Sequence, residues 1–231
     1  MAPSPSILPG SNPDRDCGRC PRLKAFRDHY RASEPAWHNA PVPTWVGSDG
    51  DHSVRFLVVG LAPGLRGANR TGRPFTGDYA GDLLYETMVK HGLAAGRYGA
   101  DPDDGLDLIG AAITNSVRCV PPQNKPVGEE INACRPFLAA TLERFPNLEA
   151  MLTLGKIAHD STLRMLGARA ASSPFSHGGQ HQIGKYRLFS SYHCSRYNTN
   201  TGRLTPEMFD EVFREIAAFL AHKQSGPRSR T

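Results

Sequence analysis

Residues 60–78 read Gly-Leu-Ala-Pro-Gly-Leu-Arg-Gly-Ala-Asn-Arg-Thr-Gly-Arg-Pro-Phe-Thr-Gly-Asp, and they follow directly on the apolar run 56–59. Glycines let the backbone approach a ligand closely, and the side chains of Arg66, Arg70 and Arg73 suit phosphate or carbonyl oxygens. The stretch ends on one acid, Asp78, immediately before a predicted helix. This pattern predicts a nucleotide-binding pocket that contains one carboxylate. The alternative is a Gly/Pro-rich surface connector.

The composition indicates one soluble domain. Of the 231 residues, 39% are hydrophobic and 21% are charged, which is enough for one core. Lys and Arg number 27 against 22 Asp and Glu, so the net charge of +5 favours polyanionic partners only modestly. The first residues lack the features of a signal peptide, and no run reaches the roughly 18 apolar residues of a membrane span. We therefore expect a cytoplasmic protein, without a membrane partner, whose cysteines are ligands and not disulfides.

Strand-like and helix-like segments alternate between two expected flexible ends, a leader at 1–16 and a basic tail at 223–231. Short apolar runs predict strands at 55–60, 109–117, 149–154 and 186–192. Helical patterns are found at 79–92, 128–144, 155–167 and 205–222. This alternation is typical of an α/β domain, here 17–222, in which a parallel sheet is covered on both faces.

The expected location of the site follows from this layout, because ligands of open α/β sheets bind beyond the carboxyl ends of the strands. The loops expected to meet there are 63–78, 114–115, 155–156 and 193–198. The glycine-rich loop should therefore lie beside Asn115 and His193. Asn115 is also consistent with a simple cap of the turn that follows a buried strand.

The cysteines form a second pattern. Cys17 and Cys20 are a Cys-x2-Cys pair, Cys119 and Cys134 are a wider pair, and Cys194 stands apart. Four thiolates can ligate zinc or an iron–sulfur cluster. Structural zinc sites usually have two tight pairs, so the wide second pair favours iron–sulfur, although zinc and plain buried cysteines stay open.

Three segments together resemble one known family: the 60–78 loop, Thr114-Asn-Ser-Val-Arg-Cys119 and His193-Cys-Ser-Arg-Tyr-Asn198. They are similar to the uracil-DNA glycosylase superfamily, specifically its fifth family, the type b enzymes of bacteria and archaea. The likeness extends from about Cys17 to the end of the last helix. It implies a three-layer α/β/α fold around a four-stranded parallel sheet. It also implies a structural [4Fe-4S] cluster, and its ligands would be Cys17, Cys20, Cys119 and Cys134.

The resemblance also assigns the polar groups of the site. Most branches of the superfamily place an acid or amide two residues after the first glycine of the motif, Gly60, and this chain has Ala62 there. The fifth family instead uses the aspartate at the end of the loop to direct water, which matches Asp78. Asn115 would bind the polar edge of the flipped base. His193 would bind the pyrimidine O2 and stabilise the leaving base.

Other positions complete the implied base pocket. Gly60 and Ala62 would line it, and Phe75 would stack on the base. The superfamily often reads His-Pro-Ser where this chain has His193-Cys194-Ser, so the resemblance does not define the rigidity of that loop.

The implied activity is monofunctional hydrolysis of the N-glycosidic bond of uracil, hypoxanthine or xanthine in double- or single-stranded DNA. It would leave an abasic site, favour G·U over A·U pairs, and require base flipping. We expect a monomer associated with the nucleoid. The alternatives are a non-catalytic iron–sulfur protein that binds DNA lesions and a hydrolase of free nucleotides.

DNA contacts are expected from three groups of residues. Arg66, Arg70 and Arg73 are the phosphate candidates, and Arg196 and Tyr197 are the candidates for a wedge in the base stack. Tyr197 is equally consistent with an ordinary half-buried aromatic residue. Basic residues near the cysteines are also expected to face the DNA backbone, namely Arg19, Arg22 and Arg118. His159 is expected on the surface of a helix or as a residue that fills the helix, and no role is assigned to His177 and His181.

Overall fold

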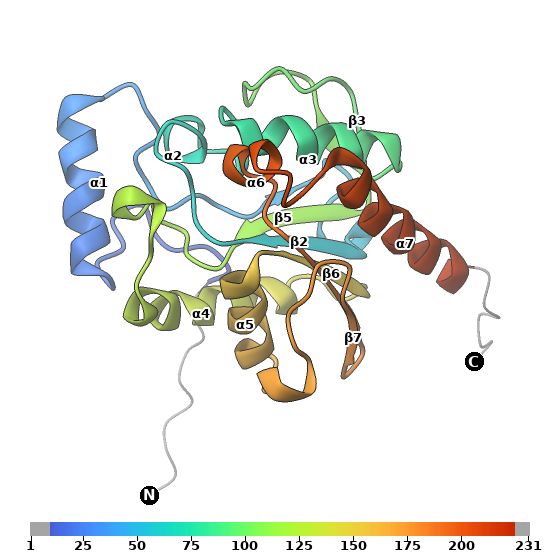
Figure 1. Ribbon diagram of the computed structural model, residues 1–231. Helices are drawn as coiled ribbons and strands as arrows, with labels where there is room; N and C mark the ends of the chain where they lie inside the picture. Colours follow the sequence, from blue (N-terminus) through green and yellow to red (C-terminus); the bar gives the residue numbers. More distant parts are fainter. Residues whose placement is uncertain (1–9, 225–231) are drawn as a thin grey trace, which may run out of the picture.

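Four parallel strands form the centre of the molecule. The computed structural model describes residues 10–224, and the main sheet has the order β1-β5-β2-β6-β8-β7. The central strands are β5 (Ala111–Asn115), β2 (Phe56–Gly60), β6 (Ala150–Leu154) and β8 (Tyr186–Ser191). Each pairs in parallel with its neighbour. The predicted four-stranded parallel sheet is therefore confirmed (Figure 1).

Two antiparallel strands at the edges of this sheet were not predicted. β1 (Trp45–Val46) pairs with β5, and β7 (Gln180–Ile183) pairs with β8. β1 has only two residues, and β7 reads Gln-His-Gln-Ile, so neither contains an apolar run. A separate two-stranded sheet, β3 (Ala94–Ala95) and β4 (Asp107–Leu108), is equally short.

Successive residues of the central strands point to opposite faces, and each face is covered by helices. Phe56 and Val58 pack with residues of α3 (Tyr79–Lys90) and α7 (Pro206–Gln224). Leu57 and Val59 pack with α4 (Gly128–Glu143) and α5 (Lys156–Met165). Figure 1 shows these two pairs of helices on opposite sides of the sheet. The α/β/α class is therefore confirmed.

Shorter elements complete the described residues. Three further helices are α1 (Pro21–Ser33), α2 (Ala68–Thr71) and α6 (Arg196–Asn200). Three 3-10 turns are η1 (Asp51–Ser53), η2 (Pro122–Asn124) and η3 (Ala170–Ser172). α1 was not predicted, because it buries only Leu23 and Arg27 and so has no apolar stripe.

The expected terminal segments lie only partly within the described residues. Residues 1–9 of the leader and 225–231 of the tail lie outside them. Nearer the domain, Asn12 Oδ1 accepts hydrogen bonds from Thr44 N at 2.9 Å and from Arg118 Nη1 at 3.3 Å. Asn12 belongs to the expected leader, so the part of that leader that the structure describes contacts the core. Among the helices that the structure describes, none has the length and apolarity needed to cross a membrane.

Candidate active site

A cavity of about 620 Å³ opens beyond the carboxyl ends of β2, β5 and β8. Its lining includes four residues predicted to contact a base, Ala62, Phe75, Asn115 and His193, together with Asp78, which was predicted to direct water. Residues that are far apart in the chain therefore meet beyond the carboxyl ends of the parallel strands, where ligands of open α/β sheets bind. Gly60 was also predicted to line the base pocket, but it is not among the residues that line this cavity. The loop at 155–156 was expected in the same place, but neither residue lines this cavity.

Asp78 is the N-cap residue of α3, directly before Tyr79, and its backbone is extended. Its Oδ1 is buried without a hydrogen-bond partner among the described residues. Burial raises the pKa of Asp78, and the backbone N–H groups of Ala80 and Gly81 oppose this rise. A carboxylate at a helix N-terminus is favoured by the helix dipole. Asp78 therefore has spare capacity to accept a proton or to bind a water molecule.

Two glycines of the 60–78 loop lie against this carboxylate. A methyl group on Gly64 would lie 2.7 Å from Asp78 Oδ2. A methyl group on Gly67 would lie 2.9 Å from Asp78 Cγ and closer still to Oδ2. The glycine-rich sequence is thus explained in part by the space that Asp78 occupies.

Asn115 ends β5 directly beside Gly60, the last residue of β2. The Asn115 amide forms no hydrogen bond with another residue in the part of the chain that the structure describes, and it lines the cavity. A side chain on Gly60 would collide with Asn115 Oδ1 and would lie 2.6 Å from Phe75 Cζ. Gly60 therefore allows the amide and the Phe75 ring to approach each other at the cavity wall.

His193 follows β8 and stacks on Phe75, with ring centroids 5.9 Å apart and an interplanar angle of 28°. Burial lowers the pKa of His193 to about 4, so the imidazole is neutral at neutral pH. His193 nevertheless lines the cavity. A neutral imidazole can donate a hydrogen bond to a carbonyl oxygen without carrying a charge into the pocket.

Cys194 explains how the His-Cys-Ser loop is held. Its thiol is fully buried and donates to the carbonyl of Ala80 at 3.4 Å. Ala80 lies in the first turn of α3, two residues after Asp78. Cys194 therefore joins the loop that carries His193 to the helix that begins at Asp78.

The other four cysteines, Cys17, Cys20, Cys119 and Cys134, line a second, small cavity. It lies among α1, α4 and the segment after β5, and its apolar lining includes Leu23, Val117 and Phe137. Within residues 10–224, no three His, Cys, Asp or Glu side chains are placed to hold a single metal ion. The four thiols thus surround a space and do not converge on one point.

Two N–H groups point at sulfur atoms of this set. Arg27 Nη1 donates to Cys119 Sγ at 3.3 Å, and the Arg118 backbone N–H donates to Cys134 Sγ at 3.3 Å. Burial raises the pKa of Cys119 to about 12, although the Arg27 guanidinium opposes this rise. A positively charged group bound beside Cys119 would favour the ionised form of its thiol.

Comparison with known proteins identifies the family. The profile described as "Uracil DNA glycosylase superfamily" matches residues 48–217. The chain belongs to the uracil DNA glycosylase superfamily. It is 44% identical to the type-5 uracil-DNA glycosylase of Thermus thermophilus, over 86% of this chain and 91% of that protein. It is 40% identical to the type-5 enzyme of Pyrobaculum aerophilum over 88% of both chains, and 27% identical to the type-4 enzyme of that organism over 89% of both.

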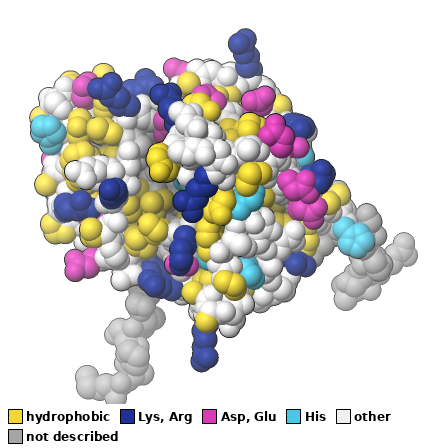
Figure 2. All heavy atoms as spheres, in the orientation of Figure 1, with side chains coloured by type: hydrophobic (Ala, Val, Ile, Leu, Met, Phe, Trp, Pro, Cys, Tyr) yellow, Lys and Arg dark blue, Asp and Glu magenta, His cyan; other side chains and the backbone are white. Residues whose placement is uncertain are grey.

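The cationic residues of this superfamily member divide into exposed and buried ones. Arg66 and Arg196 line the cavity, and Arg70 is exposed on α2. Figure 2 shows Lys and Arg side chains spread down the middle of the face that carries α6. Tyr197, on α6, is 73% exposed, so the alternative of a half-buried aromatic residue is wrong.

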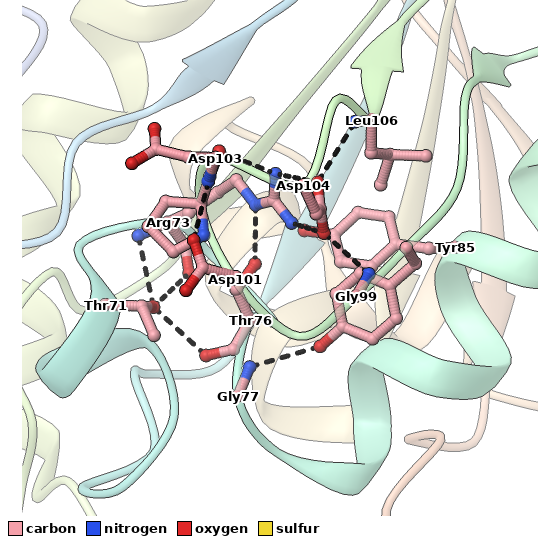
Figure 3. Close-up of polar contacts among 12 residues, drawn as sticks. Thr71, Arg73, Thr76, Gly77, Tyr85, Gly99, Asp101, Asp103, Asp104 and Leu106 are labelled. Atoms are coloured by element: carbon pink, nitrogen blue, oxygen red, sulfur yellow. Dashed lines mark hydrogen bonds and ion pairs between the residues drawn. The ribbon is translucent and has the colours of Figure 1, made fainter.

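Two predicted DNA contacts are wrong. Arg73 is only 5% exposed, because its guanidinium forms an ion pair with Asp104, with Nη2 to Oδ2 at 2.7 Å (Figure 3). Arg118 is 1% exposed and donates to Thr44 Oγ1 at 2.8 Å and Thr141 Oγ1 at 2.7 Å. Neither guanidinium can reach a phosphate. Both arginines join segments inside the glycosylase fold.

The sequence analysis also missed parts of the cavity. Tyr79, Asn124 and Ser195 line it, and Asn124 has a positive φ of 56°. No sequence signal marks that conformation, although asparagine adopts it more readily than most residues. His159 is not on the surface, since its ring is buried and hydrogen-bonded to Ser190 Oγ and to the Ser173 carbonyl.

Proposed function

We propose that this protein is a monofunctional uracil-DNA glycosylase, which hydrolyses the N-glycosidic bond of uracil in DNA and leaves an abasic site. Hypoxanthine and xanthine are proposed as further substrates. One observation carries the proposal. Asp78, Asn115 and His193 line a single cavity, and their polar side-chain atoms include a buried carboxylate oxygen that has no hydrogen-bond partner within residues 10–224. Family membership and the type-5 relatives support the same activity.

The proposed reaction separates a base that becomes anionic from a sugar that becomes cation-like. Asp78 would orient the attacking water and stabilise the cation-like sugar with its negative charge, and it would take up a proton from the water as the new C–O bond forms. A carboxylate in this role typically contributes about 10²–10⁴-fold. His193, neutral at pH 7, would donate to the base oxygen on which charge develops. One such preorganised donor is worth roughly 2.7–4 kcal/mol.

Two further residues would hold the base. The Asn115 amide can donate and accept at once, which matches the alternating edge of uracil. The Phe75 ring would stack on the base, and its stacking on His193 supports this placement. Ala62 supplies apolar lining and no competing polar group.

A base has to leave the duplex stack before it enters the cavity, at a cost of a few kcal/mol that is smallest for mispaired bases. G·U pairs would therefore be preferred over A·U pairs. Arg196 and Tyr197 are the proposed wedge, because both are exposed next to His193 at the start of α6. Arg66 and Arg70 are the proposed phosphate contacts.

Single-turnover excision from a uracil-containing duplex, with alkaline cleavage of the product, tests the proposal. We expect Asp78→Asn and His193→Ala each to lower the rate by at least about 10²-fold. Asp103→Asn, an exposed acid outside the cavity, is the matched control and should retain the rate. Tight binding to uracil DNA without alkali-labile product would instead favour a non-catalytic lesion-binding protein. Release of base from free deoxyuridine would favour a nucleoside hydrolase.

The cysteine cavity is proposed to hold a [4Fe-4S] cluster through Cys17, Cys20, Cys119 and Cys134. The support is that four thiols surround one space, with N–H donors aimed at two sulfur atoms. When bound, the cluster would supply covalent cross-links among α1, α4 and the segment after β5, and no redox step is proposed. Iron and sulfide analysis with a visible spectrum tests this. Cys134→Ser should lose iron and Cys194→Ser should retain it, whereas stoichiometric zinc would contradict the cluster.

A further inference from the structure

The turn that carries Phe75 and Asp78 has an unfavourable backbone. It connects α2 to α3, and Phe75 has a φ of 52° while Gly77 has a φ of 90°. Glycine adopts such angles freely, but the left-handed region is unfavourable for a bulky aromatic residue. Surrounding structure must therefore hold Phe75 in this conformation.

Two tyrosine hydroxyls hold the backbone of this turn. Tyr98 Oη donates to the Phe75 carbonyl at 3.2 Å and accepts from the Gly77 N–H at 3.1 Å. Tyr85 Oη donates to the Pro74 carbonyl. Burial raises the pKa of Tyr98, so the hydroxyl keeps its proton and can both donate and accept. Tyr98 thereby connects the residue that stacks on the base to the peptide that precedes Asp78.

A buried ion pair fixes the position of Tyr98. Asp104 binds Arg73 through two hydrogen bonds, at 2.9 and 2.7 Å, and also accepts from the N–H groups of Gly99 at 2.8 Å and Leu106 at 3.0 Å. These bonds close the loop that contains Tyr98. The Arg73 guanidinium also lies 5.9 Å from the centroid of the Tyr98 ring. Figure 3 shows Arg73 and Asp104 facing each other beside this turn, with the Gly77 amide directed at a tyrosine hydroxyl.

The arrangement links the ion pair to the active site through backbone groups. Arg73 Nε donates to Thr76 Oγ1 at 2.7 Å, so the residue between Phe75 and Gly77 is also held by its side chain. Tyr98 itself does not line the cavity. Any effect of Tyr98 on chemistry must therefore act through the positions of Phe75 and Asp78.

We propose that Tyr98 is a positioning residue for base excision, whose hydroxyl sets the Phe75 ring and the Asp78 carboxylate against an everted base. The proposal rests on the glycosylase function proposed above. The Tyr98 hydroxyl bonds the backbone of Phe75 and Gly77, whereas the side chains of Arg66 and Arg70, the proposed phosphate contacts, precede this turn in the chain. Removal of the hydroxyl should therefore reduce the rate of the chemical step and leave DNA affinity unchanged.

The test compares Tyr98→Phe, which removes only the hydroxyl, with Tyr186→Phe in β8 as the matched control. Three quantities are measured: the single-turnover excision rate, the Kd for a duplex containing 2′-fluoro-deoxyuridine, and the hydrogen-exchange rate of the Gly77 amide by NMR. For Tyr98→Phe we expect an excision rate lower by about tenfold, an unchanged Kd and faster hydrogen exchange of the Gly77 amide. Tyr186→Phe should match the unaltered protein in all three.

The outcomes separate this inference from the proposed function. An unchanged excision rate in Tyr98→Phe, or an unchanged Gly77 exchange rate, would overturn the positioning role. A rate loss matched by an equal loss of DNA affinity would also overturn it. If the unaltered protein releases no uracil, the proposed function fails, and Gly77 exchange alone then decides whether Tyr98 holds the turn.

Discussion

The substitution Gly67→Ala tests the placement of Asp78 most directly. An added methyl group would lie 2.9 Å from Asp78 Cγ and 3.1 Å from Asp78 Cβ, where ordinary contacts begin at 3.4 Å, and it would be closer still to Oδ2. The carboxylate therefore has to move by about 1 Å, and a misplacement of that size costs on the order of 10²-fold in rate. We expect such a loss in single-turnover excision of uracil.

Two further glycine variants give this experiment an internal scale. Gly64→Ala would place its methyl group 2.7 Å from Oδ2 but 3.8 Å from Cγ, so the carboxylate moves less and the rate should fall less. Gly128→Ala, at the start of α4, meets no atom within 4 Å and should keep the full rate. The expected order of rates is therefore Gly128→Ala, then Gly64→Ala, then Gly67→Ala.

Stability has to be measured beside activity, because the backbone of Gly67, with φ −94° and ψ −114°, lies outside the main allowed regions for other residues. Thermal unfolding and circular dichroism define the temperature at which each variant is fully folded, and rates are compared there. A folded Gly67→Ala protein that excises uracil at the unaltered rate would refute the proposed role of the Asp78 position.

Two further predictions concern pH and salt. Because burial raises the pKa of Asp78, the excision rate should rise with pH along a one-proton limb whose midpoint lies above 3.8, while His193 stays neutral down to about pH 4. This limb should be absent from the residual activity of Asp78→Asn. If the limb persists in that variant, it belongs to a group other than Asp78. Arg66→Ala and Arg70→Ala should each weaken DNA binding at all sequences and reduce the slope of log K against log salt by about 1, whereas Arg169→Ala, exposed near η3, should change neither.

The fold was predictable where each segment carries its own pattern. The run 56–59 is buried on both faces of the sheet, so it reads as a continuous apolar strand in the sequence. β1 and β7 carry no such run, because they lie at the edges of the sheet and their residues stay partly exposed. α1 has almost no apolar face, since its two buried side chains, Leu23 and Arg27, pack near the cysteines.

The site was predictable for a different reason. Asp78 and His193 are 115 positions apart in the sequence, but both follow parallel strands that end at the same edge, so topology alone places them together. The prediction that Arg73 contacts phosphate was wrong because its ion-pair partner, Asp104, lies in a loop that no sequence pattern marks. Within the 60–78 loop, three arginines look alike as sequence, and only tertiary packing separates the buried one from the exposed two.

Several independent contacts converge on Asp78, and together they explain how an alanine at position 62 is compatible with hydrolysis. A buried carboxylate whose Oδ1 has no partner in the described part of the chain is unfavourable for the folded state, so it persists only if its surroundings prevent it from turning away. The backbone of Gly64 and Gly67 lies against it on one side, and Cys194 holds the first turn of its helix. Because these restraints come from two distant parts of the chain, the 60–78 loop and Cys194, the carboxylate is held in place without a polar neighbour at position 62. Its reactivity therefore depends on packing as much as on charge.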